Sequence, residues 1–167
     1  REHIGDISSQ EDIFKGSILE NISLGDDSIP LPRILQVAEE IGLSQFIQMS
    51  PFGIQTELLP GGKNIPNSIT SKILVARAVV RAPGLLALED PLGKLNQRDR
   101  LQIAHYLTDK KHPWTLICAS DDPILAAFSD RILVLKEGEI VFDGTFDAVQ
   151  KTVHFEKVFH SMYRSNE

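Results

Sequence analysis

The fold is decided by residues 85–90, Leu-Leu-Ala-Leu-Glu-Asp, a short apolar run that ends in two acids and Pro91. A continuous apolar run of this length is typical of a buried strand in a parallel sheet. A second run of the same kind covers residues 114–119 and is followed by Ser120 and two more acids. Asn96, placed between the two runs, predicts the N-terminal cap of a helix that extends to about Thr108.

Strand, helix and strand in this order predict a parallel βαβ unit. In open sheets of this class, ligands bind beyond the carboxyl ends of the strands. Glu89, Asp90 and Ser120, with Asp121 beside it, all fall at such ends. The two acidic strand ends are therefore the first candidates for a functional site.

An all-helical block is predicted upstream of these strands. Ser17 with Glu20 three residues later forms a capping box for a short helix over residues 16–22. Residues 51–66 are rich in Gly and Pro and indicate a loop. Further helices are predicted at 34–41, where Ile34, Leu35, Ala38 and Ile41 have helical spacing before Gly42, and at 44–49 and 68–81.

The helix at 68–81 has its apolar face at Ile69, Ile73, Ala76, Val79 and Val80, with Lys72, Arg77 and Arg81 elsewhere. Asn67 or Ser68 is expected to cap it. The remaining expected elements are a strand end at 4–8, a short helix at 123–128, a hairpin around Glu137-Gly138 with arms at 131–135 and 139–142, and a helix over 146–163.

The amino-acid composition excludes several classes of function. Apolar residues make up 42% of the 167 residues and the net charge is −6, which is ordinary for a globular protein and argues against a nucleic-acid partner. The single cysteine, Cys118, excludes an internal disulfide, and the five histidines lack the spacing of metal ligands. We find no transmembrane span or signal peptide, and without an initiator Met we expect the chain to be a piece of a longer protein.

Several segments, in fixed order, resemble the ATP-binding domain of ABC transporters of the exporter type. GSILENISLG follows Gln10 as a helix follows the family's Q-loop, and IPNSITSKILVARAVVRAP aligns without a gap to the signature motif and its helix. LLALEDPLGKLN falls where the Walker B strand and D-loop belong, and TLICASDDPILAAFSDRILVLKEGEIVFDGT matches the switch-histidine strand and closing hairpin. Together these segments cover nearly the whole chain.

The resemblance implies an α/β fold: a partial P-loop NTPase core with a mostly parallel sheet, plus an all-helical subdomain. It places the end of a core strand and the Q-loop in residues 1–16. The helical subdomain with the signature-like helix then covers 17–82, and the second half of the ATPase core with the C-terminal helices covers 83–167.

The same resemblance assigns roles to the acids. Glu89 takes the place of the Walker B Asp, which holds Mg²⁺, and Asp90 takes the place of the catalytic Glu, so the two acids are present in swapped order. The alternative is that both are solvated acids at a strand end. Gln10 would be the Q-loop residue that links the metal to the transporter.

Other positions depart from the family. Ser120 replaces the switch histidine, and a serine carries no charge near neutral pH; the alternative is a turn between a strand and a helix. Asn67 and Ser68 replace the signature glycines, so their side chains crowd the approach of a phosphate to the helix start. No Walker A motif, G-x-x-x-x-G-K-[ST], occurs in the sequence, and Gly61-Gly62-Lys63 is interpreted as a turn.

These features predict a fragment of an ABC transporter ATP-binding subunit at the cytoplasmic face of a membrane, with a degenerate and weakly hydrolysing site. ATP and Mg²⁺ would bind the intact parent, but neither is expected to bind this fragment tightly. The expected partners are a transmembrane domain and a second ATP-binding domain in a dimer, with no nucleic acid. The alternative is a non-catalytic ABC-like module for dimerisation or regulation, while a DNA-repair ATPase is disfavoured by the acidic charge and the lack of a coiled-coil insertion.

Overall fold

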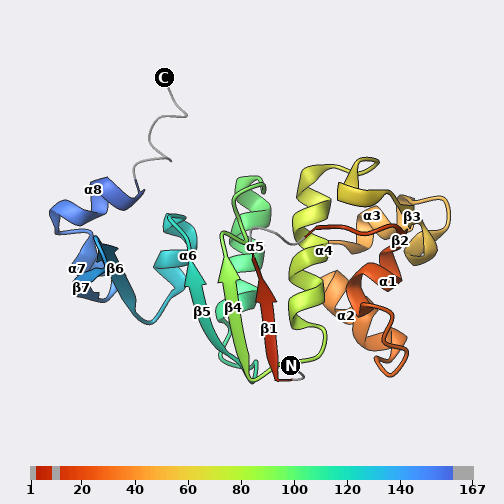
Figure 1. Cartoon of the computed structure of the whole chain (residues 1–167), viewed down its shortest axis with the longest axis horizontal. Coiled ribbons are helices and arrows are strands. Elements are labelled where there is room, and N and C mark those ends of the chain that lie inside the picture. Colours follow the sequence, from red (N-terminus) through yellow and green to blue (C-terminus); the bar gives the residue numbers. More distant parts are fainter. Residues whose placement is uncertain (1–2, 9–11, 160–167) are drawn as a thin grey trace. The chain divides into compact units, whose positions relative to one another are not determined.

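The computed structural model describes residues 3–8 and 12–159 of the chain (Figure 1). The chain divides into two compact units, Arg1–Ala119 and Ser120–Glu167. The first unit contains a three-stranded sheet and a helical block, and the second contains a hairpin with short helices. The domain boundaries expected after residues 16 and 82 remain predictions.

The sheet of the first unit is parallel throughout. Its order is β1-β4-β5, formed by Ile4–Ile7, Leu85–Glu89 and Thr115–Ala119. In its register Ile7 pairs with Leu88, and Glu89 pairs with Ala119. The predicted βαβ unit is confirmed, with helix α5 (Gln97–Thr108) as the crossover and Asn96 as its cap, since the Asn96 side chain accepts from the Asp99 N–H at 3.0 Å.

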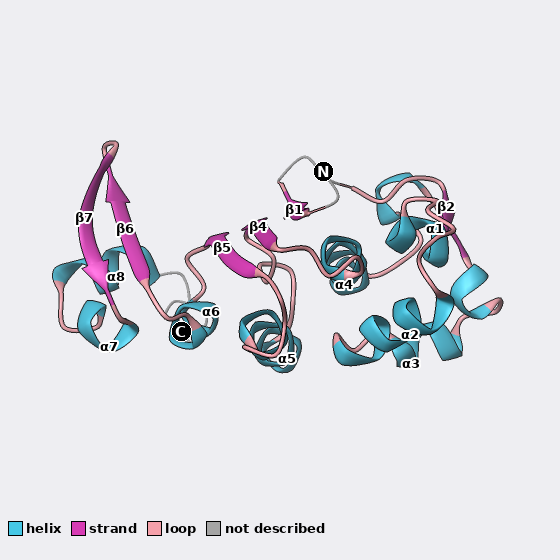
Figure 2. Cartoon of the chain, turned by 90° about the horizontal axis from the view of Figure 1, so that it is seen from below, coloured by secondary structure: helices cyan, strands magenta, loops and turns pink. Residues whose placement is uncertain are grey.

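The sheet is buried on one face only among the described residues. Leu86 and Leu88 are buried, whereas Ala87 and Glu89 are exposed, and the Ile117 side chain on β5 is 62% exposed. Figure 2 shows α5 on one side of these strands. The expectation that both strands are buried throughout was therefore wrong, because a pleated strand turns alternate side chains to opposite faces.

The helical block begins as the sequence indicates. Helix α1 (Ile18–Ser23) starts at a complete capping box, in which the Glu20 N–H donates to the Ser17 hydroxyl at 3.1 Å and the Ser17 N–H donates to the Glu20 carboxylate at 2.7 Å. Helices α2 (Leu31–Glu40) and α3 (Ser44–Met49) follow. Ile34, Ala38 and Ile41 are buried as expected, but Leu35 is exposed because it falls outside the stripe that faces the block.

The loop predicted between α3 and α4 contains short regular pieces. Two 3-10 turns, η1 (Gly53–Gln55) and η2 (Pro60–Gly62), flank strand β3 (Glu57–Leu58), which pairs antiparallel with β2 (Gly16–Ser17).

Helix α4 (Asn67–Val79) runs antiparallel to the strands of the sheet (Figure 1). A Cβ at Gly5, near the start of β1, would overlap the Ala78 carbonyl oxygen, so the end of α4 lies against the start of β1. A helix rises about 1.5 Å per residue and a strand about 3.3 Å, so the 13 residues of α4 span a length similar to that of the strands. Because α4 is antiparallel to the strands and its end lies at the start of β1, its first turn lies toward the carboxyl ends of the strands.

Two details of α4 correct the sequence analysis. Pro66 occupies the N-cap position, and neither Asn67 nor Ser68 caps the helix, because both are already helical. Lys72, expected away from the apolar face, is buried, and its ammonium donates to Asp99 at 2.8 Å and to the Gly42 carbonyl at 3.0 Å. The long side chain reaches its partners on the neighbouring elements from within the block.

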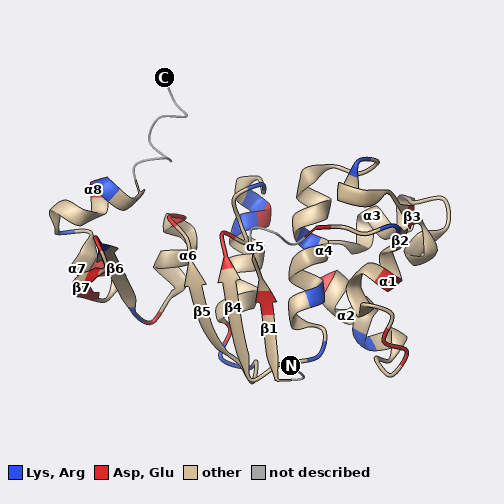
Figure 3. Ribbon diagram, viewed as in Figure 1, with Lys and Arg blue, Asp and Glu red and all other residues tan. Residues whose placement is uncertain are grey.

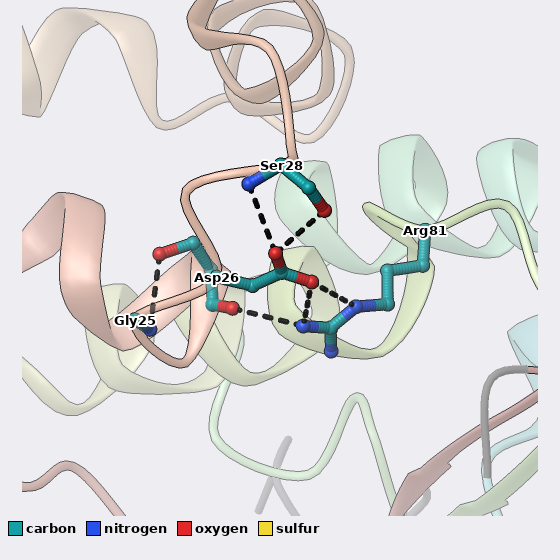
Figure 4. A network of polar contacts seen from close by, with 5 residues as sticks. Gly25, Asp26, Ser28 and Arg81 are labelled. Carbon is teal, nitrogen blue, oxygen red and sulfur yellow. Dashed lines mark hydrogen bonds and ion pairs between the residues drawn. The ribbon is translucent and has the colours of Figure 1, made fainter.

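Three arginine side chains form hydrogen bonds between α4, or the residues just after it, and the neighbouring elements of the helical block. The Arg33 Nε donates to the Val80 carbonyl at 3.1 Å, and the Arg77 Nε donates to the Asn21 carbonyl at 2.8 Å. Figure 4 shows the third contact, in which Arg81 pairs with the Asp26 carboxylate at 2.6 Å while Ser28 donates to the other carboxylate oxygen. Ser28 and then Arg81 lower the pKa of Asp26 to about 2.

The second unit opens with helix α6 (Pro123–Phe128), followed by the antiparallel strands β6 (Ile132–Lys136) and β7 (Glu139–Gly144). Helices α7 (Phe146–Val149) and α8 (Val153–Phe159) then pack on the hairpin through buried Val134, Val149 and Phe159. The single helix predicted over 146–163 is divided, because the Thr152 hydroxyl donates to the Val149 carbonyl and accepts from the His154 N–H. Residues 160–163 lie outside the described residues.

Candidate nucleotide-binding site

The two acids predicted to be functional lie together at the carboxyl end of β4. Glu89 is the last residue of the strand, and the N–H of Asp90 donates to the Ala119 carbonyl at 2.9 Å. Both acids are exposed, and Figure 3 marks acidic residues in red where β4 ends. This placement fits the edge where ligands bind in parallel sheets.

Glu89 and Asp90 differ in backbone conformation. Glu89 continues the strand, whereas Asp90 has a φ of 41° and starts the turn that leads toward α5. A non-glycine residue with positive φ is uncommon, and such conformations cluster at functional sites. The shorter acid, Asp90, therefore stands at the bent position and the longer acid, Glu89, on the regular strand.

The Asp90 side chain is folded against its own turn. A Cβ added to Gly93 would overlap the Asp90 carboxylate, so these atoms lie against the bare Cα of Gly93. Leu92 and Leu95 are buried and anchor the turn on both sides. Gly93 thus provides the space that the Asp90 carboxylate occupies.

The start of α4 presents the signature-like residues. Asn67 is exposed and Ser68 is half-buried in the first turn of the helix. The first N–H groups of a helix have no intrahelical partners and attract anions. The Cβ atoms and side chains of these two residues stand where glycines would allow the closest approach of a ligand to the backbone.

Ser120 opens the second compact unit and directly follows β5 in the chain. Its hydroxyl accepts from the Asp122 N–H at 3.1 Å, and the Asp122 carboxylate in turn accepts from the Ile124 N–H at 2.8 Å. Asp122 is the N-cap of α6. These bonds form a turn between a strand and a helix, the alternative that the sequence left open for this position.

Gln10, the predicted Q-loop residue, lies outside the described residues. Gly61 and Gly62 form the turn that the sequence indicates, with φ of 72° and 63°, and the Gly61 N–H donates to the Ile13 carbonyl. Asn64 closes this turn, since its side chain accepts from the Leu59 N–H and donates to the Glu57 carbonyl.

Within residues 3–8 and 12–159, no group of three or more His, Cys, Asp or Glu side chains is arranged to hold a metal ion. In the same ranges, no helix has the length and apolar character needed to cross a bilayer.

No family model matches the chain. An uncharacterised ABC transporter ATP-binding protein of Bacillus subtilis is 27% identical over 98% of the chain, and an ATP-dependent lipid A-core flippase of Saccharophagus degradans is 26% identical over 98%. The chain spans 28% of the length of each of these relatives.

A structural relative covers the whole chain. The structure of a bacterial Atm1-family ABC exporter with ATP bound matches 100% of this chain and 29% of its own, with a TM-score of 0.86 and 21% identity. The chain is thus similar in sequence to ABC transporter ATP-binding proteins and shares the fold of part of an ABC exporter.

Proposed function

We propose that this chain is part of the ATP-binding domain of an ABC exporter and that its own half of the nucleotide site is degenerate. The observation that carries the proposal is the pair of acids at the carboxyl end of β4, in a parallel sheet beside a helix whose first turn lies toward the same edge. The similarity to ABC transporter ATP-binding proteins over 98% of the chain supports it.

In the intact parent, Mg²⁺ and ATP would bind at the carboxyl end of β4. The exposed carboxylate of Glu89 fits a magnesium ion that keeps most of its ligands as water and phosphate oxygens. Gln10 would contribute to the same metal from the Q-loop. Bound Mg²⁺ would neutralise charge on the phosphates, and the chain's own part is to position that ion.

Asp90 would be a weak general base for the attacking water. A positioned base contributes about 10²–10⁴-fold to a rate. The Asp90 carboxylate is one methylene shorter than that of a glutamate and lies against Gly93, within the turn. Because a displacement of about 1 Å can cost about 100-fold, we expect slow hydrolysis at this site.

Asn67 and Ser68 would face the phosphates of the nucleotide held by a second ATP-binding domain. The start of α4 keeps the dipole that favours an anion, but Pro66 lacks an N–H and the two side chains block close contact. Ser120 would supply one hydroxyl in place of an imidazole. We therefore expect this chain to activate a partner's site poorly.

The partners of the parent follow from the same proposal. A transmembrane domain would receive the motion of the ATP-binding domains, and the chain would lie on the cytoplasmic face of that membrane. The alternative function is a non-catalytic ABC-like module for dimerisation or regulation. Two observations favour this alternative. The Ser120 hydroxyl accepts a hydrogen bond within its own turn, and the Asp90 carboxylate lies against Gly93, so both side chains contact their own turns.

A chimera tests the two functions. Residues 1–167 would replace the matching part of the lipid A-core flippase, with the unaltered flippase as control. Retained ATP binding with hydrolysis at least about 100-fold slower is expected. The double change Glu89→Asp with Asp90→Glu should recover part of the hydrolysis rate. Adding Ser120→His, Asn67→Gly and Ser68→Gly should increase the rate by more than the separate changes predict, because such groups act as a unit.

Hydrolysis by the chimera at the flippase rate would contradict the degenerate site. Loss of ATP binding in a chimera that still folds and dimerises would favour the non-catalytic module instead. Size-exclusion chromatography and circular dichroism of each chimera separate these outcomes from misfolding.

A further inference from the structure

Three buried polar atoms lie away from the nucleotide edge and are not used by the proposed function. They are Oε2 of Glu40, the hydroxyl of Tyr106 and Nε2 of His112, and none has a hydrogen-bond partner among the described residues. Buried polar atoms without partners are rare in folded proteins and call for an explanation. The three come from the end of α2, from α5, and from the connection between α5 and β5.

His112 is held by aromatic contacts. Its ring stacks on Trp114 with centroids 4.1 Å apart and an interplanar angle of 11°, and it meets the Tyr106 ring edge-on at 4.5 Å. Trp114 is itself fixed, because its indole N–H donates to the Leu107 carbonyl at 2.8 Å. The imidazole therefore lies between two aromatic rings, with its Nε2 buried.

The charged groups around His112 act in both directions. Burial lowers the pKa of His112, and the positive charges of Lys111 and Arg33 lower it further. The negative charges of Asp109 and Glu40 oppose this shift. Burial, together with the charge of Glu40, raises the pKa of Tyr106 to about 12, so this phenol stays neutral at physiological pH.

Glu40 connects this cluster to the helical block. Its Oε1 accepts from the Gln36 side chain at 3.3 Å, and its backbone carbonyl accepts from the Gln102 side chain on α5 at 2.9 Å. Arg33, one helical turn before Gln36, donates to the carbonyls at the end of α4. Glu40 and Arg33, whose charges act on His112, thus also take part in the contacts that join α2 to α5 and α4.

We propose that His112 is a pH-sensitive element of this fold, whose neutral imidazole seals the contact between α2, α5 and the start of β5 and whose protonation loosens that contact. An imidazolium at this half-buried position loses part of its hydration, and its buried Nε2 has no hydrogen-bond acceptor among the described residues. Between the folded and the ordinary pKa of about 6.5, the unfolded chain binds more protons than the folded one. The stability that His112 contributes is therefore complete above about pH 6.5 and is lost as the pH falls below it.

Trp114 provides the readout, because it is the single tryptophan of the chain and an imidazolium in contact with an indole quenches its fluorescence. In the 167-residue chain, we expect Trp114 emission to fall on acidification with a midpoint below about 6.5. His112→Gln should abolish this step, whereas His105→Gln, on the exposed side of α5, should keep it. Glu40→Gln should move the midpoint lower, because the charge of Glu40 favours protonation.

A second measurement follows stability. As the pH is lowered from 7.5 to 5, the urea midpoint of the unaltered chain should decrease, and the urea midpoint of His112→Gln should decrease less. A step that survives in His112→Gln, or a midpoint above about 6.5, would overturn the proposal, since the latter would mean that pairing with Glu40 dominates. If His112→Gln does not fold, an NMR titration of the imidazoles in the unaltered chain, with His105→Gln for assignment, replaces it. A His112 midpoint below about 6.5 then supports the proposal, and one above it overturns the proposal.

Discussion

The buried ion pair between α4 and α5 gives the sharpest test of the fold. The Lys72 ammonium lies 2.8 Å from the Asp99 carboxylate, and the two side chains are only 7% and 15% exposed. Removing one partner of a buried pair costs about 3–5 kcal/mol. Asp99 keeps the Asn96 amide as a donor and some contact with water, so we expect Lys72→Met to lower the free energy of unfolding by about 3 kcal/mol, near the bottom of that range.

Urea unfolding followed by Trp114 fluorescence measures this change. With a slope of about 2 kcal/mol per M, the midpoint should fall by about 1.5 M. Lys136→Met is the matched control, because Lys136 and Glu137 are 66% and 84% exposed, and exposed pairs contribute about 0–1 kcal/mol. If Lys72→Met and Lys136→Met cost the same, or if a cycle with Asp99→Asn shows no coupling, the pair does not hold the two helices together.

Three further outcomes are expected. Gly5→Ala should destabilise the chain by about 1–3 kcal/mol, because its Cβ would overlap the Ala78 carbonyl and force β1 from α4; an unchanged thermal midpoint would argue against this close approach. Asp26 has its pKa lowered to about 2, so the urea-midpoint difference between the unaltered chain and Asp26→Asn should be constant above about pH 5 and vanish as the pH falls toward 2. Isothermal titration should show no saturable Mg-ATP binding to the 167 residues at micromolar concentrations, because the sequence has no Walker A motif; tight binding would contradict the predicted role of that motif.

The sequence predicted elements whose signals are local. The capping box at Ser17, the cap at Asn96 and the parallel strand at 85–88 each depend on neighbouring residues, and each was confirmed, although the strand is buried on one face only. Periodicity could not predict the burial of Lys72, because its partners are 27 and 30 residues away in the chain.

The start of α4 shows a second limit. Asn and Ser are strong N-caps, so the pattern favoured Asn67 or Ser68 over the proline before them. Proline fixes φ near −65°, and Pro66 takes the extended N-cap conformation with φ of −60° and ψ of 145°. The backbone therefore begins the helix one residue earlier than the side-chain preferences indicate, and both polar residues become first-turn residues.

The candidate site depends on a contact that no sequence pattern predicts, the one between Asp90 and Gly93. Gly93 does not have a positive φ, so an alanine fits its backbone and Gly93→Ala tests only the space for the Asp90 carboxylate. We expect Gly93→Ala to cost about 1–3 kcal/mol in the unaltered chain and much less in an Asp90→Ala background, where the overlapping atoms are gone. Equal costs in both backgrounds, measured by urea unfolding, would refute the contact. Coupling between the two would mean that this turn, rather than the two acids alone, determines where the Asp90 carboxylate can reach.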